Sequence, residues 1–63
     1  MKRPFVTIIT ATYNAKYDLL ITAESIRNQD YENIEWIIVD GKSTDGTQGS
    51  MVTYTDLIYQ YIY

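Results

Sequence analysis

The 63-residue sequence contains no cysteine and no histidine, and it has only one proline and three glycines. Without cysteine, the chain can form neither a disulfide nor a thiolate zinc site. Five Lys+Arg against eight Asp+Glu give a net charge of -3, so no basic excess is present to bind nucleic acid. No apolar run approaches the roughly 20 residues that cross a bilayer. We therefore expect no disulfide, no nucleic-acid partner, no transmembrane segment and a cytoplasmic location.

The length of 63 residues allows at most one small domain. The apolar share is 46%, which is ordinary for a globular protein and too high for a disordered tail. Part of the chain is therefore built to be buried.

The first two thirds of the chain show strand and helix patterns in alternation. Residues 5–10 are β-branched and almost wholly apolar, which predicts a strand buried on both faces. Residues 17–28 carry apolar side chains on one helical stripe, with Asn14 or Asp18 as a candidate cap. A second β-rich apolar run follows at 34–39. Strand, helix and strand form a βαβ unit with parallel strands, so the predicted fold class is α/β.

The rest of the chain is less regular. Residues 40–47 have turn composition, and Thr44 or Asp45 is a candidate cap for a short helix that begins near Thr47. Residues 57–63 are rich in β-formers and predict a third strand. One good helix and one weak helix cannot cover both faces of a parallel sheet. We therefore expect an incomplete fold, the N-terminal part of a larger one.

Two loop motifs are excluded by their spacing. The run Gly41-Lys42-Ser43-Thr44 looks like the end of a phosphate-binding loop, but Trp36 stands where the first glycine of that motif is needed. The loop from residue 40 is not a calcium loop either, because Lys42 takes the third ligand position and Met51 the twelfth.

The carboxyl ends of the first two predicted strands carry residues 10–14 and 40–43. Ligands of open α/β sheets bind at this edge, so we expect both loops to face one crevice. There Tyr13 could stack on a planar base, and Asp40 could accept a hydrogen bond from a ring N–H. Tyr13 could equally pack over the sheet edge, and Asp40 could do no more than cap the following turn. The residue types alone leave both interpretations open.

Four segments in order closely resemble the opening of family 2 glycosyltransferases: VTIITATYN (6–14), SIRNQDY (25–31), NIEWIIVDG (33–41) and STDGT (43–47). The resemblance covers about residues 4–47, and residues 54–59 look like the approach to the family's third strand. It implies a Rossmann-like nucleotide-diphospho-sugar transferase fold. It also implies inverting transfer of a sugar from a nucleotide donor to an acceptor hydroxyl, in polysaccharide or glycoconjugate synthesis.

The resemblance implies roles for single residues. Tyr13 matches the family's uracil-stacking tyrosine, and Asp40 matches its base-binding aspartate. Ala11 and Thr12 lie on the loop whose backbone lines the nucleotide site. For Asp45 we expect a capping role rather than ligand contact. The implied partner is a nucleotide sugar, most readily a UDP-sugar.

Other parts of the family's machinery are missing from these 63 residues. Gly41 stands where the family often has a second acidic residue, and no Asp-x-Asp metal-binding motif occurs. A divalent metal, Mg or Mn, is therefore expected only in the full-length family member, together with the general base and the acceptor half. Residues 1–63 are then a partial nucleotide-binding portion that does not catalyse transfer alone. The alternatives are a free-standing βαβ nucleotide-binding or interaction module that self-associates through its C-terminal strand, and a non-functional remnant.

Overall fold

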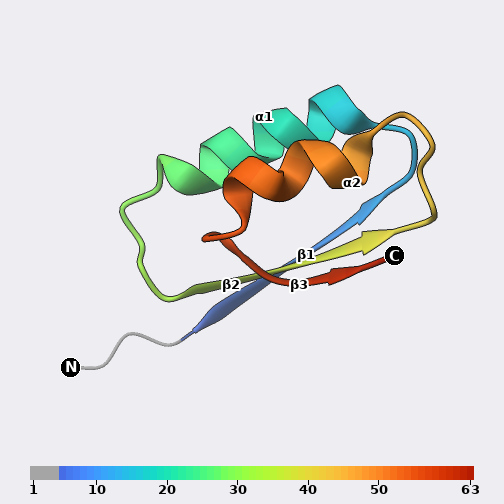
Figure 1. Cartoon of the computed structure of the whole chain (residues 1–63). Helices are drawn as coiled ribbons and strands as arrows, with labels where there is room; N and C mark the ends of the chain where they lie inside the picture. The colour runs from blue at the N-terminus through green and yellow to red at the C-terminus, as the bar shows by residue number, and fades with distance from the viewer. Residues whose placement is uncertain (1–4) are drawn as a thin grey trace.

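The computed structural model describes residues 5–63. In chain order it contains strand β1 (Val6–Thr12), helix α1 (Lys16–Arg27), strand β2 (Ile34–Asp40), helix α2 (Thr47–Ser50), the 3-10 helix η1 (Met51–Tyr54) and strand β3 (Ile58–Ile62). The strands form one parallel sheet in the order β1-β2-β3 (Figure 1). The predicted α/β class and parallel βαβ opening are confirmed, and the arrangement is Rossmann-like.

The hydrophobic core lies between the sheet and the helices. Trp36 and Ile38 of β2 are fully buried and pack in one cluster with Leu19 and Ala23 of α1. The indole Nε1 of Trp36 donates a hydrogen bond to Thr10 Oγ1 at 3.0 Å, so the polar edge of the ring is satisfied inside the core. This cluster holds β1, β2 and α1 together.

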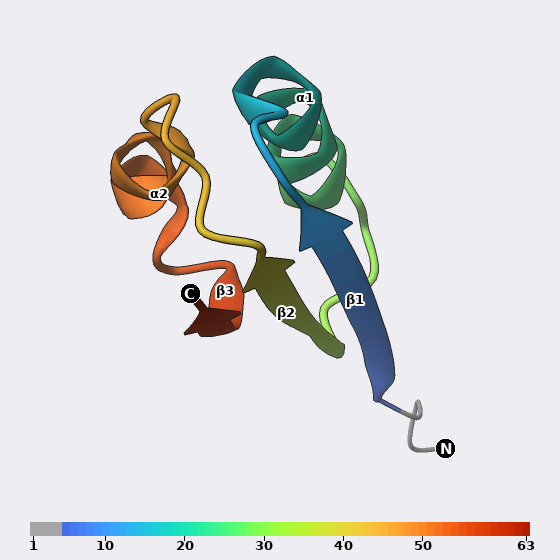
Figure 2. The ribbon, with the colours of Figure 1, turned by 90° about the vertical axis from the view of Figure 1, so that its right-hand side faces the viewer.

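The opposite face of the sheet carries no helix among residues 5–63, because α1 and α2 lie on the same side, as Figure 2 shows. On the uncovered face Ile9 is 68% exposed, Val39 39% and Ile62 44%. The prediction that the first strand is buried on both faces is therefore wrong for the part of the chain that the structure describes. Residues 5–10 have the composition for two-sided burial, but no described segment lies against their second face.

The second helical segment is short. It begins at Thr47, as predicted, but after Ser50 it tightens into η1. Gly46 precedes it with φ of +86°, a backbone conformation that glycine adopts without strain. β3 pairs with β2 through a register shift opposite Trp36 and Ile37, so Tyr61 lies beside Ile38.

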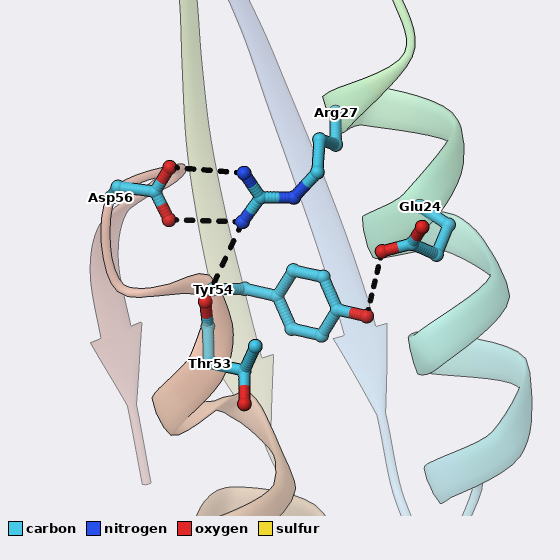
Figure 3. Close-up of polar contacts among 5 residues, drawn as sticks. All are labelled: Glu24, Arg27, Thr53, Tyr54 and Asp56. Carbon is cyan, nitrogen blue, oxygen red and sulfur yellow. Dashed lines mark hydrogen bonds and ion pairs between the residues drawn. The ribbon is translucent and has the colours of Figure 1, made fainter.

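A polar cluster joins the end of α1 to the segment before β3 (Figure 3). Arg27 contacts both carboxylate oxygens of Asp56, at 3.1 and 3.3 Å, and donates to Thr53 O at 3.5 Å. The hydroxyl of Tyr54 donates to Glu24 Oε2 at 2.8 Å. Since the Arg27 and Asp56 side chains are largely solvent-exposed, their ion pair adds little free energy. Its effect is to fix where β3 starts.

Candidate functional site

The candidate site lies at the carboxyl edge of the sheet, where β1 and β2 end side by side. Thr12 and Asp40 are aligned in the register of the two strands, and Gly41 N donates to Thr12 O at 2.9 Å. The expectation that the loops after these strands lie at one edge is confirmed.

Asn14 clasps the two loops together. Its backbone N–H donates to Ser43 Oγ at 2.8 Å, and its side-chain Oδ1 accepts from Thr44 N at 2.8 Å. Asn14 has a φ of +48°, in the left-handed region that asparagine tolerates better than most residues. Its side chain reaches the neighbouring loop and not the start of α1. The prediction that Asn14 or Asp18 caps α1 is wrong, because that helix has no side-chain cap from its own N-terminal residues.

Asp45 caps both helices from one position. Its Oδ2 accepts from Lys16 N at 3.2 Å at the start of α1. Its Oδ1 accepts from Thr47 N at 3.1 Å and from the Thr47 hydroxyl at the start of α2. The Thr47 side-chain hydrogen bond is the main cause that lowers the pKa of Asp45 below its usual value. The predicted capping role is confirmed, and it extends to α1 as well.

Asp40 is buried, with only 4% of its surface exposed. Its Oδ1 accepts from Ser43 N at 2.9 Å and from Ser43 Oγ at 2.7 Å, while its Oδ2 accepts from the Tyr61 hydroxyl at 2.5 Å. Burial alone would raise the pKa of Asp40, but the hydrogen bonds from Tyr61 and Ser43 outweigh it and hold the pKa below its usual value. The carboxylate therefore caps its own turn in ionised form, and its contact with a base stays a prediction.

Sequence reasoning missed the contribution of β3 to this site. Tyr61 lies 21 positions after Asp40, and its burial is the first cause that raises its own pKa, so the phenol stays protonated and donates. The hydroxyl of Tyr63 donates to Ser43 O at 3.5 Å. The signal in the sequence was the tyrosine at every second position from 59 to 63, which also fits an exposed strand edge.

The remaining predicted residues lie around this carboxylate. Tyr13 is 65% exposed, and a Cβ atom built on Gly41 would lie 3.5 Å from Tyr13 Cδ1, so the ring borders the residue after Asp40. Ala11 is exposed, while Thr12 is half-buried with a buried Oγ1 that has no hydrogen-bond partner. Both line a cavity of about 190 Å³ between β1 and α1. The structure thus brings Tyr13 and Asp40 to one edge and leaves the Tyr13 ring open.

No group of three or more acidic side chains gathers anywhere in residues 5–63 that could hold a metal ion. No helix in that range is long and apolar enough to cross a membrane.

A Rossmann-like parallel sheet with hydrogen-bonded loops at its carboxyl edge defines the class of the chain as α/β. Comparison with known proteins identifies the family. Residues 7–63 match glycosyl transferase family 2. The chain is 52% identical over 42 residues to WfaP of Escherichia coli, a UDP-Glc:alpha-D-GlcNAc-diphosphoundecaprenol beta-1,3-glucosyltransferase; the match covers 67% of this chain and 17% of WfaP. The chain belongs to glycosyl transferase family 2.

A second relative is TuaG of Bacillus subtilis (strain 168), named as a teichuronic acid biosynthesis glycosyltransferase. It is 40% identical over 52 residues, which is 82% of this chain and 21% of TuaG. The chain thus spans about a fifth of the length of the curated relatives it matches. No solved structure gave a significant match.

Proposed function

We propose that this chain forms the nucleotide-binding opening of a glycosyltransferase and that its ligand is a UDP-sugar. The observation that carries the proposal is the placement of Tyr13 and Asp40 on adjacent loops that Asn14 clasps together. The name of WfaP, which includes UDP-Glc as donor, supports uridine as the base.

In this proposal the chain binds and orients the donor. The open ring of Tyr13 stacks on the base, a contact worth about 1–3 kcal/mol. The ionised Asp40 accepts a hydrogen bond from the ring N–H, and the backbone at Ala11 and Thr12 lines the nucleotide. The clasp holds these groups before the ligand arrives, which lowers the entropy cost of binding. Transfer of the sugar to an acceptor hydroxyl is proposed for the whole protein only, since this chain spans about a fifth of the length of its relatives.

The test is an amide NMR titration of the 63-residue chain with uridine diphosphate, with adenosine diphosphate as the comparison ligand. We expect shifts confined to residues 11–14 and 40–43 and stronger for the uridine ligand. Tyr13→Ala should weaken binding about tenfold, because one stacking contact is lost. Tyr17→Ala is the matched control, since Tyr17 is 74% exposed on α1. Equal responses to both nucleotides, or equal affinity of both variants, would contradict the proposal.

For the biological setting we propose synthesis of a cell-envelope polysaccharide at the cytoplasmic side. Support comes from the names of two relatives, which mention teichuronic acid biosynthesis and a diphosphoundecaprenol acceptor. Deleting the coding gene should then remove one sugar from extracted envelope polysaccharide. An unchanged sugar composition would count against this setting.

We also propose that copies of the chain associate through β3, the outer strand of the sheet. Its sequence Ile58-Tyr59-Gln60-Tyr61-Ile62 carries no charge and reads the same in both directions. Antiparallel pairing about Gln60 would therefore set like residues against like, with no charge to prevent it. Gln60→Lys places two lysines face to face and should abolish dimers in sedimentation, while Gln29→Lys, the same change at an exposed position after α1, should not. A monomeric parent chain would refute this pairing.

A further inference from the structure

We propose that Tyr61 is a positioning residue for base recognition, which holds the Asp40 carboxylate in place through its hydroxyl. The inference rests on the proposed function, in which Asp40 accepts a hydrogen bond from the base. It brings β3 into a site that the sequence placed on β1 and β2 alone.

The contacts of the carboxylate show where a base can bind. The two donors of Ser43 occupy both acceptor positions of Asp40 Oδ1. Oδ2 receives the Tyr61 hydroxyl as its closest donor, and the backbone N–H of Lys42 is a weaker donor to the same carboxylate. At 2.5 Å the Tyr61 contact has the length of a strong hydrogen bond to an ionised acceptor. An incoming ring N–H therefore joins Tyr61 on Oδ2 more easily than it replaces it.

Removing the hydroxyl would change what Asp40 can do. Oδ2 would lose the donor that Tyr61 supplies, and a carboxylate oxygen left without its hydrogen bond costs free energy. The carboxylate would then either rotate toward another donor or bind a proton. A rotated or protonated Asp40 no longer presents an aligned acceptor to a ring N–H. Tyr61 thus sets both the orientation and the charge of the recognition group.

The neighbouring titratable groups leave this pair undisturbed at neutral pH. After burial, the hydrogen bond to Asp40 and the negative charges of Asp40 and of Asp45 ahead of α2 raise the pKa of Tyr61. Lys42 reaches Asp40 with its backbone N–H. Tyr61 therefore remains a donor while Asp40 remains an acceptor. Since Tyr61 pairs with Ile38, the contact exists only when β3 is in register.

The experiment compares Tyr61→Phe with Tyr59→Phe, an identical change on the same strand at a side chain that is 68% exposed. Affinity for uridine diphosphate is measured by NMR titration from about pH 4 to about pH 8. Tyr61→Phe should bind about tenfold more weakly at neutral pH, the size expected for one hydrogen bond to a charged group. Its remaining affinity should also be lost at a higher pH than in the parent chain, because Asp40 loses a bond that lowers its pKa. Tyr59→Phe should match the parent in both respects.

The outcomes separate this inference from the proposed function. If Tyr61→Phe binds uridine diphosphate with the affinity and pH profile of the parent chain, the positioning role is refuted. The proposed function of Tyr13 and Asp40 would then still stand. If the parent chain binds no uridine diphosphate, the proposed function fails and the inference fails with it. If Tyr61→Phe loses its dispersed amide signals, the variant is unfolded, and the positioning role is tested in the parent chain instead. In the parent chain the ring Cζ signal of Tyr61 should move on nucleotide addition and that of the exposed Tyr59 should not, and a stationary Tyr61 signal would refute the role.

Discussion

The carboxyl edge and the uncovered face belong to the same sheet, but they differ in how well their side chains are satisfied by neighbouring residues. At the edge, Asn14, Asp40 and Asp45 have side-chain hydrogen bonds to the neighbouring loop, strand or helix. On the uncovered face, Ile9 and Val39 expose apolar side chains. A structured polar edge therefore coexists with an apolar face that no described segment covers.

The difference shows that the geometry of the site depends on the helix side of the sheet only. Asp40 and Tyr61 face the helices, as do the core residues Trp36 and Ile38. The uncovered face enters none of these contacts. Changes on the two faces should thus have separable effects, and the following predictions test that separation.

The largest effect is expected for Trp36→Ala. Trp36 is fully buried, and truncating a buried aromatic ring costs about 3–5 kcal/mol. That loss is comparable with the whole stability of a small domain, so cooperative unfolding should disappear. Ile9→Ala, on the uncovered face of the neighbouring strand, should change the free energy of unfolding by less than about 1 kcal/mol. Urea unfolding followed by circular dichroism measures both. Equal losses would mean that the second face is buried in solution.

A smaller effect on stability is expected from substitutions of Asn14. Two substitutions at this position distinguish backbone strain from the loss of a side-chain hydrogen bond. Asn14→Ala loses the hydrogen bond to Thr44 and also strains the left-handed backbone. Asn14→Gly loses the same hydrogen bond but adopts that backbone freely. The alanine variant should therefore be less stable than the glycine variant by about 1 kcal/mol. Thermal unfolding of both variants measures the difference, and equal midpoints would show that the clasp does not constrain the backbone.

Acid should weaken the carboxyl edge by a moderate amount. The folded chain lowers the pKa of Asp40 and Asp45 below 3.8, so the unfolded chain takes up protons first as the pH falls. Their stabilising contribution is therefore complete above about pH 4 and is lost as the pH drops through the lower folded values. The unfolding midpoint should fall between neutral pH and about pH 3. Asp45→Asn should show a shallower fall, and an identical pH profile would exclude Asp45 as a contributor.

The smallest effect on stability is expected on the uncovered face. Val39→Thr exchanges an exposed methyl group for a hydroxyl on a strand where threonine is well accommodated. Its free energy of unfolding should stay within about 0.5 kcal/mol of the parent. Binding of an apolar fluorescent dye should decrease, because the exposed apolar patch is interrupted. Dye fluorescence at equal protein concentration measures this, and an unchanged signal would place the dye elsewhere.

The sequence was sufficient to predict the elements whose signals are local. Residues 6–12 and 34–40 form strands because β-branched residues dominate them, and α1 follows its apolar stripe to within one residue. The cap from Asp45 was predictable from the turn composition before Thr47. The order of the elements followed from the same patterns, and the family resemblance is confirmed by the match over residues 7–63.

The contacts that local patterns could not predict depend on register. Tyr61 reaches Asp40 only because the pairing of β3 shifts opposite Trp36 and Ile37. An alternation of tyrosines shows that they share a face but not which face. Burial of residues 5–10 was overestimated for a similar reason, since composition shows what a strand tolerates and not what lies against it.

The double cap by Asp45 has a consequence for the order of events during protein synthesis. Lys16 begins α1, but the carboxylate that accepts its N–H lies 29 positions later in the chain. At typical rates of translation, that interval corresponds to about 1.5–6 seconds. During this time the first strand and helix leave the ribosome without their native cap, and β2 follows them before Asp45 does. The N-terminal half therefore reaches its final structure only after the loop that contains Asp45 has emerged.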